Sequence, residues 1–443
     1  MQNIQKQKIE HTNLAWMVTL TASLFFFYAF IQLNLFNSID VLLMRDFHID
    51  ATQLGQLASM YFYANALFLF PAGVLLDRCS TKKLLLFAVS LTTIGTFMFG
   101  WTDQYRIAAA GRFLVGTGCS FCFLSCIRIA SRWFPPHKMA TVTGIIVVFA
   151  WLGGIVAQTP FAFLTQALDS WRHAVLIDGA LGVIIFLAIA LIVKDRPPGT
   201  LHEEQLEKQH LQDLGLWRSI KLAALNPQNW LGGLYTALMN LPVFLLGALW
   251  GIHYLVAVRH ISLVEASYAT SVFFLGLLFG SPAFGWFSDK IERRVIPMVV
   301  GAILSLGVIL VLMYAPHLSL KMIIFLFFLI GFVSSSQVLS YPTIAELNPS
   351  YLTGTAVSID SICIMISGFV FQPFFGWLMQ RNAQHHEVID GIVNYSAQDF
   401  NQAMLIIPIA FVMSLIITVL IQETYCKVVA QPPVLRPTSK VMK

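Results

Sequence analysis

Residues 154–166 read GIVAQTPFAFLTQ and residues 368–380 read GFVFQPFFGWLMQ, and this pair of stretches decides the fold. They are identical at six of thirteen positions at an offset of 214 residues. Pro135 and Pro349, in the loops before them, keep the same offset. Shared apolar composition accounts for some of these identities, but paired Gln and Pro at fixed offsets are harder to obtain by chance. The pattern therefore predicts an internal repeat.

The composition places this repeat in a membrane. Of 443 residues, 57% are apolar and 11% are charged, and the mean hydropathy is +0.73. A soluble chain carries about 25% charged residues, so these figures exclude an ordinary soluble enzyme. An aromatic content of 13% excludes a disordered chain. A polytopic membrane protein remains, and a net charge of +5 gives no reason to expect a nucleic-acid partner.

Twelve apolar runs are long enough to cross the roughly 30 Å hydrocarbon core as helices. A backbone in lipid must satisfy its own hydrogen bonds, which leaves helices or a closed barrel, and continuous apolar runs lack the alternation of barrel strands. We therefore expect an all-α membrane protein. Its transmembrane helices are expected at 15–37, 54–76, 84–101, 107–131, 139–166, 173–193, 229–256, 264–287, 295–315, 320–342, 353–380 and 400–422.

The basic residues predict the orientation. With the N-terminus inside, nineteen Lys and Arg residues fall on the cytoplasmic side and six fall in outer loops. The positive-inside rule favours this arrangement, so both termini are expected to be cytoplasmic. The first 13 residues are polar and no small-residue cleavage site follows the first span. We expect that span to be a retained helix and not a secretory signal.

A polar stretch divides the spans six and six. We expect an N-terminal six-helix bundle over 1–193, a cytoplasmic linker over 194–228, and a C-terminal six-helix bundle with a short tail over 229–443. The loops agree with this division, because Gly73 to Arg78 is repeated as Gly285 to Lys290 at an offset of 212. Two pseudo-symmetric bundles related by parallel repeats are typical of one transporter architecture.

These loops carry the residues by which the chain resembles the major facilitator superfamily, over nearly its whole length. The family's loop signature G-x-L-a-D-r-x-G-r-[RK]-[RK] is matched by Gly73, Leu75, Asp77, Arg78, Lys82 and Lys83. Ser80 and Thr81 depart from it. The second copy keeps Gly285, Asp289, Arg293 and Arg294, and the fourth span carries the family pattern R-x-x-x-G as Arg112 and Gly116. The resemblance implies the major facilitator fold.

Smaller features indicate which branch of the family the chain resembles. The fifth span lacks the Gly-Pro pair that drug/proton antiporters of the superfamily tend to carry, which disfavours a drug exporter. Arg132 to Pro136, Gly354 to Ala356 and Phe371 to Pro373 resemble bacterial carriers of small organic solutes, with the lysosomal dipeptide carriers as distant relatives.

The resemblance also implies a conformational latch in the cytoplasmic loops. In the family the loop aspartate holds the two halves together in the outward-facing state, and here Asp77 would meet the start of the span 353–380 near Thr353. The alternative is a solvated turn whose cations anchor the membrane surface. The candidate latch residues are Gly73, Asp77, Arg78, Lys82, Lys83, Gly285, Asp289, Arg293 and Arg294.

Ionisable residues inside a span cost about 2.5–3.5 kcal/mol to insert, so each is a functional candidate. Arg112 either contacts a substrate anion or the proton-coupling machinery, or it is structural and binds helix-end carbonyls. Asp360, about two turns into the span 353–380, either loads and releases a proton or pairs between helices. Asp40 and Asp178 lie near the outer interface, where we expect solvated or capping roles.

Amide side chains complete the candidate substrate site. Asn34, Asn37 and Asp40 are three residues apart, which predicts one polar stripe on the first span that lines a cavity or bonds to neighbouring helices. The resemblance implies that the first, fourth, seventh and tenth spans form the cavity, so we expect Asn34, Asn37 and Asn240 to contact substrate. Gln158 and Gln372, related by the repeat, either bind an amide or carboxylate substrate or bond between helices.

Nothing in the sequence predicts a cofactor or a metal site. Cys119, Cys122 and Cys126 share the helix face of Arg112, but no His joins them, so we expect small packed residues and not metal or redox chemistry. No Cys falls in an outer loop, so structural disulfides are not expected. No Walker-type loop or catalytic triad is present, so we expect no enzyme activity and no cofactor.

These features predict a secondary active transporter that moves a small polar organic solute by alternating access, with uptake coupled to protons. The solute classes are an amino acid, a short peptide or an organic anion. Export of a siderophore, metabolite or drug, a uniporter, and a transporter-like receptor are the alternatives. We expect a monomer in the bacterial inner membrane, whose partners are its small-molecule substrate, protons and the lipid bilayer.

Overall fold

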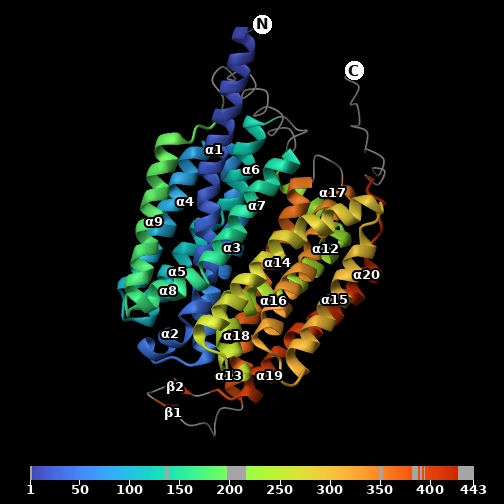
Figure 1. The fold of residues 1–443 in the computed structure, drawn as a ribbon. Coiled ribbons are helices and arrows are strands. Elements are labelled where there is room, and N and C mark those ends of the chain that lie inside the picture. Colours follow the sequence, from blue (N-terminus) through green and yellow to red (C-terminus); the bar gives the residue numbers. More distant parts are fainter. Residues whose placement is uncertain are drawn as a thin grey trace, which may run out of the picture.

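The fold is seen in a computed structural model that is helical along almost all of its described length (Figure 1). The start of α1 and the end of α20 lie at the same end of the molecule, here called the terminal end (Figure 1). The opposite end, where α2, α13 and α19 lie, is called the far end. The described residues are 2–134, 139–196, 216–348, 353–381, 388–389, 392–393 and 395–427.

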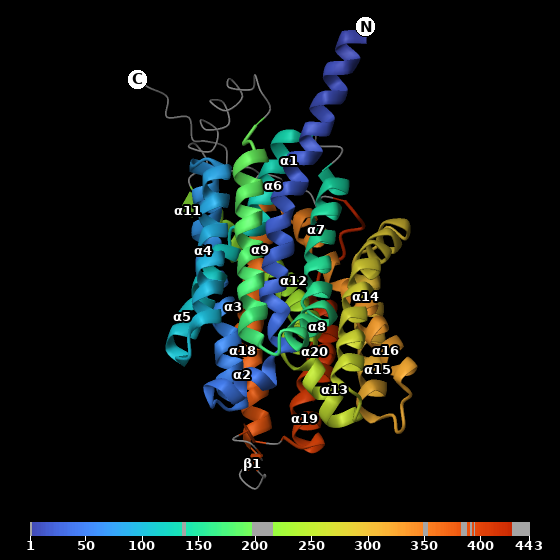
Figure 2. The same cartoon turned by 60° about the vertical axis from the view of Figure 1, so that its left-hand side comes forward.

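The helices of the first half of the chain lie together on one side of the molecule (Figures 1 and 2). They are α1 (Gln2–Asn34), the 3-10 turn η1 (Leu35–Ser38), α2 (Asp40–Phe47), α3 (Ala51–Arg78), α4 (Thr81–Trp101), α5 (Tyr105–Cys119), α6 (Cys122–Trp133), α7 (Met139–Val156), α8 (Thr159–Ala167) and α9 (Trp171–Ile192).

The helices of the second half lie on the other side, and α3 and α18 pack along each other between the two (Figure 1). They are α11 (Leu216–Leu225), α12 (Pro227–Met239), the π-helical η3 (Val243–Trp250), α13 (Gly251–Arg259), α14 (Leu263–Lys290), α15 (Val295–Tyr314), α16 (Leu320–Ser334), the 3-10 turn η4 (Ser335–Leu339), α17 (Ser340–Glu346), α18 (Thr353–Arg381), α19 (Ala397–Met404) and α20 (Ile406–Leu420).

The expected helical class is confirmed, with one small exception. Strands β1 (Val388–Ile389) and β2 (Ile392–Val393) form an antiparallel pair in which Val388 lies opposite Val393. The sequence held the signal for it, because an Asp-Gly dipeptide stands between two β-branched pairs, and that pattern favours a tight hairpin.

Fewer membrane spans are counted among the described residues than the twelve expected. Ten helical segments among the described residues are long and apolar enough to cross a membrane. The bent pair of α12 and η3–α13, which meet at 41°, makes an eleventh if it is one span. α3 covers the expected run 54–76 over 28 residues and is not among these ten.

The internal repeat is visible in the caps of equivalent helices. His48 ends α2 and His260 ends α13, both in the left-handed region with φ of 51° and 53°. Two residues later, Asp50 and Ser262 open α3 and α14 with capping boxes. Both pairs are 212 residues apart, the offset seen in the sequence.

Two glycines show why the helices of each half pack so closely. A Cβ added to Gly116 of α5 would lie 2.2 Å from the carbonyl oxygen of Tyr61 on α3. A Cβ added to Gly331 of α16 would lie 2.1 Å from that of Phe273 on α14. Helices in lipid gain no hydrophobic free energy from meeting each other, so small residues that allow backbone contact carry their association.

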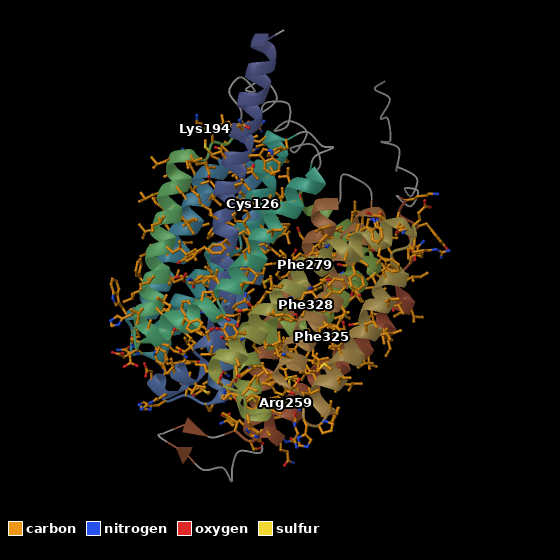
Figure 3. All side chains as sticks on the ribbon, in the orientation of Figure 1. Cys126, Lys194, Arg259, Phe279, Phe325 and Phe328 are labelled. Carbon is orange, nitrogen blue, oxygen red and sulfur yellow. The ribbon has the colours of Figure 1, made fainter. Side chains whose placement is uncertain are left out.

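Large apolar side chains cover the outside of the bundle. Phe279 on α14 and Phe325 on α16 are 55% and 54% exposed, and they lie on the outer surface of the second half (Figure 3). Leu191 on α9 and Val419 on α20 are more exposed still. Contiguous exposed apolar surface of this extent is suited to lipid.

Substituting Gly331 by Ala tests the close helix contact. Because the added methyl group overlaps a backbone carbonyl, we expect Gly331→Ala to cost roughly 1–3 kcal/mol and to lower the melting temperature of the purified protein. The control is Gly307→Ala on α15, where an added Cβ meets no atom within 4 Å. Equal melting temperatures for the two variants would contradict the packing argument.

Candidate functional site

The two halves of the molecule meet at the break in the helix formed by α12, η3 and α13. Asn37 of η1 donates through Nδ2 to the Leu246 carbonyl at 3.0 Å and to Gln158 Oε1 at 2.8 Å. Its Oδ1 accepts from the Ile252 N–H at 3.0 Å. All of these groups are buried, so Asn37 serves here as a bridge between the halves.

The two repeat-related glutamines bind the same broken helix. Gln158 donates through Nε2 to the Gly247 carbonyl at 2.8 Å, and Gln372 donates to the Phe244 carbonyl at 3.0 Å. The i+5 hydrogen-bonding pattern of η3 displaces these carbonyls from an ordinary helical ladder, so side-chain amides satisfy them. The structure thus brings Asn37, Gln158 and Gln372 together around η3, while Oε1 of Gln372 accepts no described hydrogen bond.

The predicted polar stripe of Asn34, Asn37 and Asp40 is wrong for Asn34 and holds for the other two residues. The helix ends at Asn34 and continues as the 3-10 turn η1, and Asn37 and Asp40 both face the second half, at Ile252 and His253. Asn34 donates to the Phe30 carbonyl of its own helix at 2.7 Å, and its Oδ1 is buried without a described partner. Asn240 lies at the end of α12 with 7% of its surface exposed.

The expectation of a solvated Asp40 is also wrong. Asp40 opens α2 and is 3% exposed, because it faces the other half of the molecule. Its Oδ2 lies 3.1 Å from Nδ1 of His253 on α13, and Phe400 of α19 packs edge-on against the imidazole. Asp40 Oδ1 accepts from the Val41 N–H at 2.8 Å, so the expected capping role is present as well.

A second contact between the halves fastens α3 to α18 at the far end. Gln380 donates to Asp50 Oδ2 at 2.8 Å and accepts from the Thr52 hydroxyl at 2.6 Å. The hydroxyl of Tyr395 accepts from the Ala51 N–H at 3.0 Å. A Cβ added to Gly376 of α18 would lie 2.2 Å from the Ala51 carbonyl oxygen, so the two backbones touch.

Arg112 is buried inside the first half. Its Nη1 donates to the Gln32 carbonyl at 2.9 Å, and its guanidinium carbon lies 4.5 Å from the centre of the Phe36 ring. The amide of Gln32 donates to Asp178, so one glutamine links the arginine to the carboxylate. Asp178 is 5% exposed, which corrects the expectation of a solvated residue. Sequence position alone had placed it near the outer interface, whereas α9 packs that turn against α1 and α4.

Asp360 is buried in the second half without a cationic partner in the described structure. It has no exposed surface, and neither carboxylate oxygen accepts a hydrogen bond of normal geometry. The hydroxyls of Thr236 on α12 and of Ser340 and Tyr341 on α17 lie around it. The structure keeps Asp360 apart from Arg112, which belongs to the other half.

At the terminal end, the signature loops bond within their own halves. Arg294 donates to Glu346 at 2.7 Å and to Asp289 at 2.6 Å. Burial lowers the pKa of Arg294, but its hydrogen bonds to Glu346 and Asp289 outweigh this and raise the pKa above the ordinary value. The guanidinium of neighbouring Arg293 stacks 4.5 Å from the ring of Tyr425.

Equivalent carboxylates cap the two helices that follow these loops. Asp195, just after α9, accepts from the Lys82 N–H at 2.7 Å at the start of α4. Glu423, just after α20, accepts from the Arg294 N–H at 2.7 Å at the start of α15. Lys82 and Arg294 are 212 residues apart, so both halves use the same clamp.

The remaining residues of the predicted latch either have no described element packed on them or have side chains outside the described residues. An added Cβ at Gly73 or Gly285 would meet nothing within 4 Å, so no described element packs on either glycine. Lys83 contributes its backbone N–H to the Ser80 cap at 3.2 Å. The side chains of Asp77 and Arg78, and that of Thr353, lie outside the described residues.

Arg128 is the intramembrane charge that sequence reasoning missed. It lies on α6 inside the apolar segment Tyr105–Trp133, and an arginine inside a span is itself the signal that could have found it. α6 buries one face against α1 and α4, where Cys126 donates to the Ala22 carbonyl. α3 and α7 flank α6, and these two helices contact the second half, while Arg128 itself is half-buried.

His253, Glu346 and Glu423 were missed for a different reason. Each is an ordinary residue at a helix end, and its partner lies far away in sequence. Among the described residues no group of three or more His, Cys, Asp or Glu side chains could hold a metal. Cys119, Cys122 and Cys126 are buried free thiols.

Comparisons with known proteins agree with this geometry. The family model of the Major Facilitator Superfamily matches residues 20–371 and 233–424. A probable sulfoacetate transporter of Cupriavidus necator is 23% identical over 86% of this chain and 90% of its own. A probable galactarate/D-glucarate transporter of Escherichia coli is 23% identical over 76% and 82%, and the E. coli membrane sensor protein UhpC is 24% identical over 75% and 78%.

Among solved structures, a bacterial homolog of the human lysosomal transporter Spinster superposes with a TM-score of 0.73. It is 17% identical and covers 93% of this chain and 96% of its own, and it was solved in an inward-facing and unoccupied conformation. The helical fold, the repeat and the family match lead to one conclusion. The chain belongs to the Major Facilitator Superfamily, whose members are multi-pass membrane transporters and not enzymes.

Proposed function

We propose that this protein takes up a small organic anion by alternating access, driven by a proton gradient. The two moving bodies are residues 1–193 and 229–443, joined by the linker 194–228, in which α11 packs against α12 and α18. The protein is a monomer of the bacterial inner membrane with both termini in the cytoplasm.

Twelve spans follow if α3 is counted. Its 28 residues extend about 42 Å, more than the roughly 30 Å of hydrocarbon. Its polar residues Ser59 and Asn65 are buried, because α3 packs against α5 and α18. Polar side chains that face protein do not oppose insertion as lipid-facing ones do, so α3 can span the membrane with these residues.

The observation that carries alternating access is the asymmetry between the two ends. Described hydrogen bonds between the halves join η1, α3 and α8 to η3, α13, α14 and α18 near the far end. At the terminal end, Asp289, Arg294 and Glu346 bond within one half. With cytoplasmic termini this is an inward-facing state, and rocking requires the far-end contacts to open while the signature loops close.

The substrate class rests on the relatives and on the cations of the first half. Two of the relatives above are named as probable transporters of sulfoacetate and of galactarate/D-glucarate, and two others are named for transport of hexose phosphate and D-galactonate. All of these compounds are anions. Arg112 donates to the Gln32 carbonyl and lies beside Asp178, so we assign the anion to Arg128 on α6, whose neighbours α3 and α7 contact the second half.

A receptor is the second candidate, because one relative is a membrane sensor. Counterflow in liposomes separates the two functions. We expect exchange of at least one labelled anion among sulfoacetate, galactarate, D-glucarate, D-galactonate and a hexose phosphate. Thermal stabilisation by one of these anions without any exchange would favour the receptor function and exclude the transport function.

The latch is tested by Asp77→Asn in the same assay. If this carboxylate closes the terminal end, its loss removes a hydrogen bond to a charged group worth about 1.5–3 kcal/mol, so exchange slows at least about tenfold in a folded protein. Glu292→Gln is the control, because Glu292 is an exposed acid in the equivalent loop of the second half. Unchanged exchange in Asp77→Asn would exclude a latch.

The anion contact is tested by Arg128→Gln. Loss of a charge-assisted hydrogen bond should raise KM about tenfold or more, and Arg128→Lys should recover part of it. Arg381→Gln is the matched control, because Arg381 lies exposed beside Trp377 at the far end. An unchanged KM in Arg128→Gln would place the anion elsewhere.

A further inference from the structure

We propose that Asp360, with Thr236 and Ser340, forms a binding site for one monovalent cation in the second half, apart from the anion site in the first. The inference rests on the proposed transport function and names the site at which its driving ion binds. It is carried by a carboxylate that the described structure leaves without any positive partner.

The first step is the state of the carboxylate. Asp360 has no exposed surface, and neither of its oxygens accepts a hydrogen bond of normal geometry. The titratable groups that face it are Tyr341 of α17 and Cys363 on its own helix, while α12 contributes Thr236. No Lys, Arg or His faces it among the described residues. A buried carboxylate without a cation is strongly disfavoured unless it binds a proton or a metal ion.

The second step concerns the direction of the nearby hydroxyl protons. Ser340 Oγ donates to the Gln337 carbonyl at 3.0 Å. Thr236 Oγ1 donates to the Gly232 carbonyl at 3.1 Å, and it also contacts Ser340 Oγ. Each hydroxyl has one proton, and the carbonyls of Gly232 and Gln337 compete with the Asp360 carboxylate for these two protons. When the carbonyls hold the protons, the hydroxyl lone pairs face the carboxylate, and a positive charge between the oxygens makes that arrangement favourable.

The third step is the helix break beside the site. The helix formed by α16, η4 and α17 changes to 3-10 geometry over Ser335–Leu339, directly before Ser340. The carbonyl of Gln337 lies in this break, accepts from Ser340 Oγ, and lies 3.4 Å from Thr236 Oγ1. Broken helices in transporters supply the backbone oxygens that coordinate Na⁺ or accompany a bound proton.

The fourth step limits the size and charge of the ligand. A Cβ added to Gly233 of α12 would lie 3.2 Å from the Asp360 Cα, so α12 and α18 cross closely here and favour a small ligand. One carboxylate balances one positive charge. The ligand is therefore a proton or a small monovalent metal ion such as Na⁺, and the oxygen ligands are compatible with both.

The two halves consequently differ in their buried charges. In the first half Arg112 and Asp178 lie together with Gln32 between them. In the second half Asp360 has no such counter-charge. An ion that neutralises Asp360 would bind through α12, α17 and α18, whereas the anionic substrate is assigned to Arg128 in the first half.

The experiment compares wild type with Asp360→Asn, which keeps the shape of the side chain and removes its charge. Melting temperatures of the purified protein are measured with NaCl replacing choline chloride at constant ionic strength, and separately from neutral to mildly acidic pH. We expect wild type to gain stability with Na⁺ or with protons, and Asp360→Asn to lose that dependence. The cation that stabilises wild type identifies the ion. Asp103→Asn, a carboxylate that is 87% exposed, is the control and retains the dependence.

A second variant keeps the test valid if Asp360→Asn does not fold. Ser340→Ala removes one oxygen ligand and leaves the carboxylate in place, so the Na⁺ concentration or pH at half-maximal stabilisation should shift. The same dependence in wild type and both variants, or none in wild type, would overturn the proposal.

Transport assays separate this proposal from the proposed function. In liposomes, Asp360→Asn should still exchange the labelled anion, because a neutral side chain imitates the ion-loaded carrier, but it should no longer accumulate the anion against its gradient. Accumulation equal to wild type would exclude the cation site and leave the transporter intact. Loss of exchange in wild type itself would instead remove the transport function.

Discussion

The structure depends on the need to satisfy every backbone polar group inside the membrane, and this need is greatest at η3. The π-helical stretch Val243–Trp250 cannot satisfy its carbonyls in an ordinary helical ladder. Amides from three other elements bind them: Asn37 at Leu246, Gln158 at Gly247 and Gln372 at Phe244. Two of these amides come from the first half, so the irregular helix also joins the halves.

The same requirement accounts for the difference between the two ends. At the far end, unsatisfied groups of one half are met by the other, as in the contact of Gln380 with Asp50 and Thr52. At the terminal end, Glu346 and Glu423 satisfy Arg294 and the start of α15 inside one half. A polar contact that crosses between moving bodies is a gate, whereas one that stays within a body makes that body rigid.

Sequence could predict the features that recur locally. Apolar runs located the helices, and the repeat at 212 reappears in the caps at His48 and His260 and in the paired clamps. The stripe of Asn34, Asn37 and Asp40 was predicted only in part, because Asn34 bonds to its own helix while Asn37 and Asp40 contact the second half, and spacing does not separate the two cases. The burial of Asp178 and the pairing of Asp40 with His253 depend on partners more than a hundred residues away, which one sequence does not reveal. Arg128 was predictable and was overlooked.

The carboxylate clamps have a consequence for biosynthesis. Asp195 follows the last helix of the first half, and it caps the start of α4, more than a hundred residues earlier in the chain. That half can thus close upon itself as soon as Asp195 has left the ribosome, before any of the second half is made. Glu423 repeats the step only at the end of translation. The order of synthesis therefore allows the first half to fold in the bilayer before the second half is complete.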